Sequence, residues 1–416
     1  MRKPSTASLP VDAPDRLRNR DRQGAVAALL LAPEAPYPPV GGGALRSASL
    51  VEYIGRRYAL DLIVFREPEA PDPAAAIPPG LVREIHVIEL PRHSKRRMAR
   101  ALRNTSRLLR AIPPLNDRFG GFDEEIRRFV DGRRYQLAVI EHSWCAGYRD
   151  TLAPYCERLL LDLHNIESAL LAGCAEAESG AAAYALRRFR AACLDLEKLW
   201  FPRFDLLLAA SEPDARRARA IAAGCSPCVY PNAIPSVPLP KAREDDAIVF
   251  SGNLGYQPNI SAIRFFRKQV WPSLRERWPG IEWRVIGKNP HAVAGLLTND
   301  ARIRLLGPVE DAVAALAAAK VAVVPMLAGS GTRVKILEAW AAGRAVVSTQ
   351  LGAEGLPVRP GEHLLSADTP EEFTAGVSSL LESKQLRDRI GAAGRDLYVT
   401  QFTWEAAWDR LRALGI

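Results

Sequence analysis

Residues 321–354, VAVVPMLAGSGTRVKILEAWAAGRAVVSTQLGAE, decide the fold of the second half of this chain. The segment begins with an apolar run of strand length and passes through a glycine-rich loop at 328–332. It continues in a helical pattern that ends at a second apolar run, 345–348. A strand, a loop, a helix and a second strand in this order are typical of a parallel sheet with helices on its faces.

The same alternation extends through the rest of the chain. In the first half we expect strands at 24–31, 60–65, 85–90, 137–140, 159–163, 206–210 and 228–230. In the second half we expect strands at 247–251, 282–286, 303–306, 321–325 and 345–348. Helical patterns separate most of these runs. The sequence therefore predicts the α/β class, with two Rossmann-like, doubly wound domains.

A proline-rich segment separates the two sets of strands. Residues 231–246 (PNAIPSVPLPKAREDD) contain four prolines and a cluster of charges, which is typical of a linker. We expect a short linker between two domains, with a flexible tail before them and a helix after them. The expected ranges are a tail at 1–23, a first domain at 24–235, a linker at 236–246, a second domain at 247–400 and a C-terminal helix at 401–416.

Composition narrows the class of protein. The chain has 416 residues, 48% of them hydrophobic and 25% charged, as expected of a globular protein with a sizeable core. Its apolar runs are far shorter than the roughly 20 residues of a membrane span, and its polar N-terminus has no signal-peptide core. Six cysteines in a chain of this length do not form a disulfide framework, so we expect a cytoplasmic protein. The Cys225–Cys228 pair lacks the further ligands of a zinc site and is expected to be structural.

The glycine-rich loop and the helix after it predict a nucleotide-sugar site. Glycines let the backbone approach an anion, and the free N–H groups of a helix start can receive a phosphate. Basic side chains beside that point add positive charge where a diphosphate would lie, and a carboxylate on the same helix can accept hydrogen bonds from sugar hydroxyls. A simple helix cap at Ser330 or Thr332 is the alternative. The residues concerned are Ser330, Gly331, Thr332, Arg333, Lys335 and Glu338.

Candidate ligand contacts in the first domain follow its strands. His142 comes after the strand predicted at 137–140, and His164 and Asn165 come after the one predicted at 159–163. Ligands bind beyond the carboxyl ends of strands in such sheets, although each histidine could instead be structural. Gly42 and Gly43 lie between the first strand and a helix predicted at 44–58, where a glycine-rich loop can line a pocket for a phosphate or an acceptor. A loop that merely needs positive φ is the alternative.

An arginine-rich helix accounts for part of the net charge of +9. Five arginines recur every three or four residues and predict one basic stripe, which could rest on anionic lipid headgroups. We expect Met98, Leu102, Leu109 and Ile112 to pack inward; a solvated basic face is the alternative reading. Nucleic-acid binding is disfavoured, because no known module accompanies the stripe. The stripe consists of Arg96, Arg100, Arg103, Arg107 and Arg110.

Several short motifs occur in a characteristic order and resemble the GT-B glycosyltransferases, specifically the retaining glycosyltransferase family four. They extend from the end of the first predicted domain to the last strand of the second. The motifs are Tyr230-Pro231-Asn232-Ala233-Ile234, Phe250-Ser251-Gly252-Asn253-Leu254, Ile286-Gly287-Lys288-Asn289-Pro290, Leu306-Gly307-Pro308-Val309 and Gly343-Arg344-Ala345-Val346-Val347.

The resemblance implies two Rossmann-like domains that face each other across a cleft, with the C-terminal helix packed back on the first domain. It implies transfer of a hexosyl residue from a nucleotide-diphosphate sugar, with retention and without a metal or other cofactor. The acceptor would be a glycan or a lipid-linked molecule in cell-surface polysaccharide or glycolipid synthesis. The enzyme would then be cytoplasmic and peripheral at the inner face of the membrane.

The resemblance also assigns roles to residues. His142 would be catalytic, near the donor sugar, and His164 and Asn165 would lie on the acceptor side. Glu338 matches a glutamate that is associated with the donor ribose, and the diphosphate would lie between Gly42 and the start of the Lys335 helix.

This chain departs from the family pattern at two places. The first glutamate of the family's pair would fall at Ser330, so this chain lacks it. Asn253 and Pro258 stand where the family has an arginine and a lysine for the diphosphate, and Asn253 is a candidate donor contact. Arg333 and Lys335 would supply the missing charge. Two other functions stay open: a nucleotide-sugar epimerase or sugar phosphorylase of the same architecture, and a non-catalytic sugar-nucleotide-binding protein.

Overall fold

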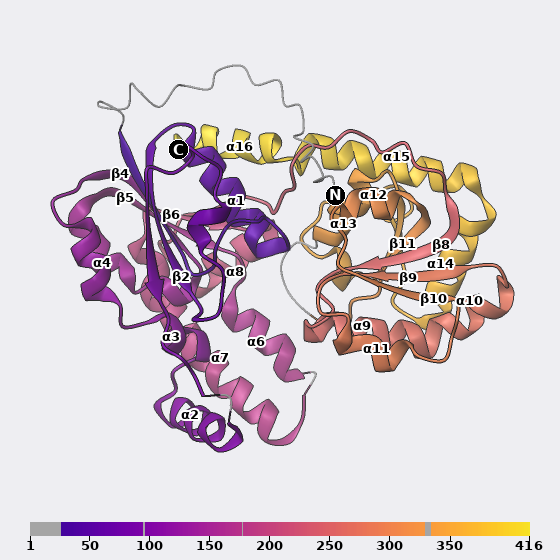
Figure 1. Ribbon diagram of the computed structural model, residues 1–416, viewed down its shortest axis with the longest axis horizontal. Coiled ribbons are helices and arrows are strands. Elements are labelled where there is room, and N and C mark those ends of the chain that lie inside the picture. Colours follow the sequence, from indigo (N-terminus) through magenta and orange to yellow (C-terminus); the bar gives the residue numbers. More distant parts are fainter. Residues whose placement is uncertain (1–25, 95, 177, 329–333) are drawn as a thin grey trace, which may run out of the picture.

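The computed structural model describes residues 26–94, 96–176, 178–328 and 334–416. These residues fold into two α/β lobes that lie side by side, with the C-terminal helices running along both (Figure 1). The tail predicted at 1–23 lies outside the described residues. No helix in the described part of the chain is long and apolar enough to cross a membrane.

The first lobe contains a parallel sheet with the strand order β3-β2-β1-β4-β5-β6-β7. All seven strands predicted for the first half are present, with ends that shift by a few residues. In β1, Ala28 and Leu30 belong to one core cluster whereas Leu29 and Leu31 belong to another, so the sheet is buried on both faces. The strands are β1 (Ala27–Ala32), β2 (Ala59–Arg66), β3 (Glu84–Glu89), β4 (Tyr135–Glu141), β5 (Cys156–Leu163), β6 (Leu206–Ala209) and β7 (Pro227–Val229).

The second lobe repeats this arrangement in the order β10-β9-β8-β11-β12-β13. Its five predicted strands are present, and β13 is a further one that the sequence did not reveal, because two residues are too short for a periodic signal. The strands are β8 (Asp245–Ser251), β9 (Glu282–Ile286), β10 (Ile303–Gly307), β11 (Ala319–Val324), β12 (Ala345–Ser348) and β13 (Leu365–Ser366).

Helices connect the parallel strands and cover both faces of each sheet (Figure 1). Those of the first lobe are α1 (Gly42–Gly55), α2 (Arg97–Arg110), α3 (Pro114–Phe119), α4 (Asp123–Val130), α5 (Tyr148–Leu152), α6 (Glu167–Glu176), α7 (Gly180–Trp200) and α8 (Glu212–Ile221). The remaining helices are α9 (Gln257–Phe265), α10 (Trp271–Arg277), α11 (His291–Leu297), α12 (Ala312–Ala317), α13 (Val334–Ala341), α14 (Pro370–Glu382), α15 (Lys384–Gln401) and α16 (Trp404–Ala413).

Strand order identifies where each sheet can bind a ligand. In the first sheet the connections reverse direction between β1 and β4, and in the second they reverse between β8 and β11. The loops at the carboxyl ends of two such strands diverge to opposite faces and leave a crevice between them. A ligand is therefore expected beside the loops that follow β1, β4, β8 and β11.

The C-terminal helix packs back on the first lobe, as the sequence predicted. Helix α15 contacts α13 and β12 of the second lobe. The chain then crosses at Phe402, whose carbonyl accepts a hydrogen bond of 3.0 Å from the Ile234 amide. Helix α16 reaches α1, where Trp408 Nε1 donates to the Ser49 carbonyl over 3.1 Å. Two segments of the chain, one at Ile234 and one at Phe402, thus pass side by side between the lobes.

The expected orientation of α2 is wrong. Met98, Leu102 and Leu109 are 80%, 70% and 75% exposed, whereas Arg107 is buried. Asp117 on α3 explains the reversal, because its carboxylate lies 2.7 Å from Arg107 Nε and holds the basic side of the helix against the protein. The stripe is therefore not uniformly exposed: Arg96, Arg100 and Arg110 are exposed, but Arg103 is half-buried.

Candidate functional site

Two histidines meet at the carboxyl ends of β4 and β5. The ring centroids of His142 and His164 lie 3.7 Å apart, and both side chains are buried. Trp144 stacks on the other side of His142, with its ring centroid 3.9 Å away. The strand-end prediction therefore holds for the positions of both histidines, which form one cluster at the carboxyl edge of the first sheet.

The backbone of His142 is strained. Its φ of 66° lies in the left-handed region, which residues other than glycine rarely adopt. The surrounding chain maintains this conformation: the His142 amide donates to the Asp162 carbonyl over 2.8 Å, and its own carbonyl accepts from the Cys145 amide over 3.0 Å. Such strain costs about 1–3 kcal/mol and occurs most often at functional sites.

A buried ion pair lies beneath this cluster. Arg46 of α1 contacts both carboxylate oxygens of Asp162 at the end of β5, with Nη2 2.5 Å from Oδ1 and Nε 2.8 Å from Oδ2. Its Nη1 also donates to the Tyr230 carbonyl over 2.5 Å and to Asn232 Oδ1 over 3.1 Å. One guanidinium thus joins α1, β5 and the segment that leaves the first lobe.

Beside this pair, Glu141 ends β4 with its carboxyl group buried. Burial and the neighbouring Asp162 carboxylate raise the pKa of Glu141 well above its usual value, although the Ser47 hydroxyl donates to its Oε2 over 2.7 Å. Burial, His164 and Arg46 lower the pKa of His142 well below its usual value. Both shifts favour the neutral forms.

Among the described residues, four buried atoms of this cluster have no hydrogen-bond partner: Glu141 Oε1, His142 Nδ1, Trp144 Nε1 and His164 Nε2, the last of which lies 3.2 Å from Asp162 Oδ2. Buried polar atoms are rarely left unpaired in native proteins. A ligand or an ordered water is therefore expected to supply the missing partners.

Glu141, Asp162 and His164 also lie close enough together to be considered as metal ligands. The donor set does not suit a divalent cation, because Arg46 already occupies both oxygens of Asp162 and places a fixed positive charge there. A second cation would be repelled by the guanidinium. The group is better described as a buried polar network around Arg46.

The glycine loop of the first lobe faces both this cluster and the second lobe. Gly41 has a φ of 98°, and α1 begins after it without a side-chain cap, so its first N–H groups are not covered by a capping side chain. A Cβ at Gly43 would lie 3.9 Å from His164 Nδ1, and one at Gly42 would lie 3.4 Å from Val334 Cγ2 at the start of α13. The starts of α1 and α13 therefore converge across the two lobes.

In the second lobe, Lys335 lies near the start of α13 with its ammonium group directed toward the end of β8. Its Nζ donates to Asn259 Oδ1 over 2.6 Å and lies 4.5 Å from the centroid of the Phe250 ring. A Cβ at Gly252 would approach Nζ to 3.2 Å. These contacts hold the cation at the switch point of the second sheet.

Glu338 lies one turn after Lys335. Ser251 Oγ lies 3.4 Å from Glu338 Oε2, which ties the carboxyl group to the end of β8. Burial raises the pKa of Glu338 to about 7, although Lys335 and the Ser251 contact lower it. The carboxyl group therefore changes its charge near neutral pH.

Glycine is required where β8 and β9 end. Gly287 has a φ of 149°, and a Cβ there would lie 1.7 Å from the backbone oxygen of Gly252. The neighbouring Asn253 folds onto this turn, because its Oδ1 accepts from Asn289 Nδ2 over 2.9 Å and from the Gly255 amide over 3.0 Å. Asn253 thus lies at the carboxyl end of β8, as predicted, but its side chain is hydrogen-bonded within the loops that follow β8 and β9.

The predicted site residues fall into three groups. The first-lobe group consists of Gly42, Gly43, His142 and His164, and Asn165 follows His164 directly in the chain. The second-lobe group consists of Lys335, Glu338 and Asn253. The arginines of α2 belong to neither of these groups. Ser330, Gly331, Thr332 and Arg333 lie outside the described residues.

Sequence reasoning missed the residues that support the site. Asp162 is a charged residue inside an apolar strand, and Arg46 is a charged residue in a buried helix, so each signals that it needs a partner. The two are 116 residues apart in the chain, and no local pattern links them. Asn259 and Phe250, which orient Lys335, likewise give no local signal.

Comparisons with known proteins agree with this arrangement. Residues 245–383 match the family described as "Glycosyl transferases group 1". Over 152 residues, 34% of this chain and 39% of the relative, the sequence is 32% identical to a phosphatidyl-myo-inositol mannosyltransferase of Mycobacterium tuberculosis. Over 160 residues it is 31% identical to the lipopolysaccharide core biosynthesis glycosyltransferase LpsE of Rhizobium meliloti, covering 36% and 47% of the two chains. The match thus spans less than half the length of these relatives.

Solved structures match the fold over nearly the whole chain. A sucrose-phosphate synthase from Thermosynechococcus elongatus superposes with a TM-score of 0.70 at 16% identity, covering 94% of this chain and 98% of the other. Anabaena HepE in complex with UDP and glucose gives a TM-score of 0.65 at 14% identity, covering 94% and 99%. These likenesses show that the two lobes have the GT-B arrangement of two Rossmann-like domains.

Replacing Arg46 tests whether the buried ion pair supports the first lobe. We expect Arg46→Met to lower the free energy of unfolding by about 3–5 kcal/mol in urea titrations, because it leaves the Asp162 carboxylate buried without a counter-ion. Arg66→Met is the matched control, since Arg66 pairs with Glu89 at the surface and such pairs contribute about 1 kcal/mol or less. Equal losses in the two variants would contradict the assignment.

Proposed function

We propose that this protein is a glycosyltransferase, because residues 245–383 match the glycosyl transferases group 1 family and the chain has the GT-B fold. It moves a hexosyl residue from a nucleotide-diphosphate sugar to a glycan or lipid-linked acceptor, with retention of configuration and without a metal ion. The printed names of its relatives support such acceptors, because one relative acts on phosphatidyl-myo-inositol and another in lipopolysaccharide core synthesis.

The observation that carries the proposal is the convergence of two helix starts on one fixed cation. Gly42 at the start of α1 reaches Val334 at the start of α13, and Lys335 follows directly. Helix N-termini attract anions through their free N–H groups and their dipoles. A diphosphate at this junction would receive N–H groups from both lobes and the charge of Lys335.

The other groups are arranged around that diphosphate. Glu338, when ionised, accepts hydrogen bonds from the ribose hydroxyls, and the donor sugar extends toward His142. The acceptor lies beside His164 and Asn165. As the bond between the anomeric carbon and the diphosphate oxygen breaks, Lys335 and the two helix starts stabilise the charge on the leaving group. The acceptor oxygen bonds to the anomeric carbon from the same face, and its proton passes to the departing diphosphate.

The surface of α2 supports a membrane-bound acceptor. Met98, Leu102 and Leu109 are spaced by four and seven residues, so they form one exposed apolar row on α2. Arg97 and Arg110 are exposed on the same helix. An exposed apolar row beside arginines is typical of a helix that lies in the interface of an anionic membrane. We propose that α2 rests there as a peripheral contact at the cytoplasmic face.

Sugar transfer after substitution of Lys335 tests the proposed function. A panel of nucleotide sugars is first screened by thermal shift, since ligand binding raises the melting temperature. With the selected donor, we expect Lys335→Ala to lower the transfer rate by about 100-fold, because the leaving diphosphate loses a fixed cation. Lys320→Ala is the control, since Lys320 pairs with Asp246 at the surface.

Product analysis separates this function from its alternatives. Sugar found on an added glycan or lipid acceptor supports transfer. Epimerised donor, or sugar phosphate made with added phosphate, would instead indicate an epimerase or a phosphorylase. Donor binding without any turnover would indicate a binding protein and contradict the proposal.

The titration of Glu338 predicts a pH dependence of donor binding. Its pKa of about 7 means that raising the pH from 6 to 8 converts most of the neutral acid to the carboxylate. We expect donor affinity to rise by about tenfold over this range, because only the carboxylate accepts two hydroxyl hydrogen bonds. Isothermal titration with an intact nucleotide sugar measures it. Glu338→Gln should remove the dependence; a dependence that persists in this variant would contradict the role of Glu338.

Liposome sedimentation tests the α2 surface. We expect the triple variant Met98→Ser, Leu102→Ser and Leu109→Ser to bind anionic vesicles at least tenfold more weakly than the wild type, because each buried apolar side chain contributes about 1–2 kcal/mol. Leu306→Ser is the control, since Leu306 is an exposed apolar residue of the second lobe. Sedimentation of the triple variant at the wild-type level would exclude the membrane contact.

A further inference from the structure

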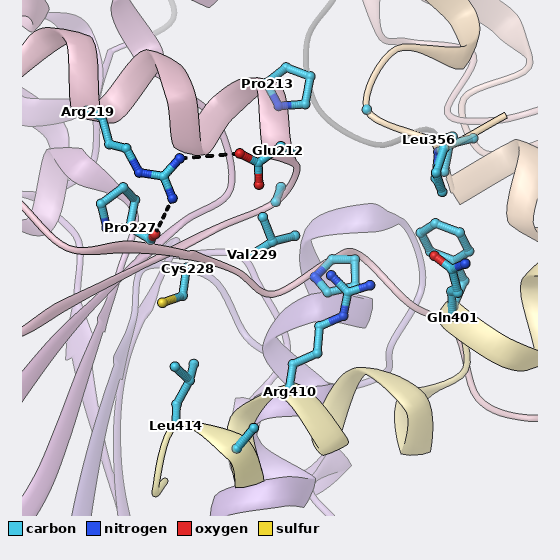
Figure 2. Close-up of a pocket in the computed structure, with 16 residues that line it drawn as sticks. Glu212, Pro213, Arg219, Pro227, Cys228, Val229, Leu356, Gln401, Arg410 and Leu414 are labelled. Carbon is cyan, nitrogen blue, oxygen red and sulfur yellow. Dashed lines mark hydrogen bonds and ion pairs between the residues drawn. The ribbon is translucent and has the colours of Figure 1, made fainter.

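A cavity of about 650 Å³ lies where the chain crosses between the two lobes, and none of the predicted site residues lines it. Figure 2 shows its walls. The first lobe contributes residues of α8 and β7, the second contributes the turn around Leu356, and α16 closes the third side. Pockets of this volume commonly hold small molecules.

Most of the lining is apolar. Pro213 and Val229 come from the first lobe, Leu356 and Phe402 from the second lobe and the crossover, and Leu414 from the end of the chain. Two opposite charges in the wall satisfy each other, because Arg219 lies 3.3 Å from Glu212 and also donates to the Pro227 carbonyl over 3.1 Å (Figure 2). These two charges therefore need no ligand.

Unlike Arg219 and Glu212, the third charged residue of the cavity, Arg410, is not neutralised by a neighbouring side chain of the described residues. It extends from α16 into the space between the walls (Figure 2). Within the described part of the chain its guanidinium forms no hydrogen bond or ion pair. Burial lowers the pKa of Arg410, and no acidic neighbour opposes that shift. By contrast, Arg412, two residues further along the helix, pairs with Asp409 at the surface. A half-buried guanidinium without a partner is costly unless an anion neutralises it.

We propose that this cavity binds a small amphipathic anion, with its phosphate or carboxylate group on Arg410 and its apolar part against Val229, Leu356 and Phe402. A guanidinium presents paired N–H donors that match a phosphate or a carboxylate. Apart from the mutually paired Glu212 and Arg219 and the amide of Gln401, the remaining side chains of the wall are mostly apolar. The preferred ligand therefore combines one anionic group with a short hydrocarbon body.

Because of where the cavity lies, a bound ligand would affect how the two lobes are oriented relative to each other. Its lining comes from both lobes and from α16, directly beside the paired crossing of Ile234 and Phe402. A ligand that contacts all three parts binds best to one relative orientation of the lobes. Because a ligand shifts an equilibrium toward the state it prefers, occupancy stabilises that orientation.

Thermal shift with hexyl phosphate as the probe tests the site. We expect the probe to raise the melting temperature of the full chain by about 2 °C at roughly ten times its Kd. Hexanol and inorganic phosphate, which each carry half of the proposed chemistry, should produce less than half of that shift. The Lys335→Ala variant should respond like the wild type, because the cavity is separate from the proposed diphosphate site.

Substitutions in the wall make the test decisive. Arg410→Met should abolish the shift without lowering the melting temperature of the free protein, since it removes an unpaired charge and keeps an apolar stem. Ala413→Trp, which fills the cavity from α16, should abolish it independently, whereas Arg412→Met should not. The proposal is wrong if the wild type shows no shift, if Arg410→Met retains it, or if Lys335→Ala removes it. Equal shifts from inorganic phosphate would also overturn it.

Discussion

The bidentate contact between Arg46 and Asp162 links most of the features of the first lobe. It fixes α1, and with it the glycine loop, to the end of β5. The same guanidinium contacts Tyr230 and Asn232, where the chain leaves this lobe. A buried charge pair tolerates little movement, because separating the charges in a low-dielectric interior is costly. The position of the loop and the exit path of the chain therefore depend on one interaction.

This ion pair also sets the electrostatics of the candidate site. Burial and then the Asp162 carboxylate raise the pKa of Glu141, whereas burial, His164 and Arg46 lower the pKa of His142. The cluster therefore presents neutral polar groups next to fixed charges. In the second lobe the positive charge of Lys335 is held by Asn259 and Phe250. The proposed roles of the two lobes follow from this contrast: the second lobe offers a fixed cation for a diphosphate, and the first offers neutral groups for sugars.

The paired crossing of the chain connects the remaining features. Ile234 and Phe402 run side by side between the lobes, and α16 then packs against α1. The cavity around Arg410 lies beside this crossing. Helix α2, which carries the exposed apolar row, lies at the far end of the first lobe (Figure 1). An acceptor held at a membrane, a donor held between the lobes and an anion held at the crossing would thus act on three separate surfaces of one molecule.

The sequence by itself determined the strands other than β13, their grouping into two domains, and the strand-end segments and helix starts near which Gly42, His142, His164, Lys335 and Glu338 lie. These features depend on local periodicity and on the rule that ligands bind at the carboxyl ends of parallel strands. Only the tertiary structure decided the rest: that Asp162 pairs with Arg46, that Arg107 turns inward and exposes Met98, and that Arg410 lies in a cavity with no partner among the described residues. Each of these features depends on which groups from other segments of the chain reach a given side chain. The packing of the folded chain decides those contacts, and the local sequence pattern does not.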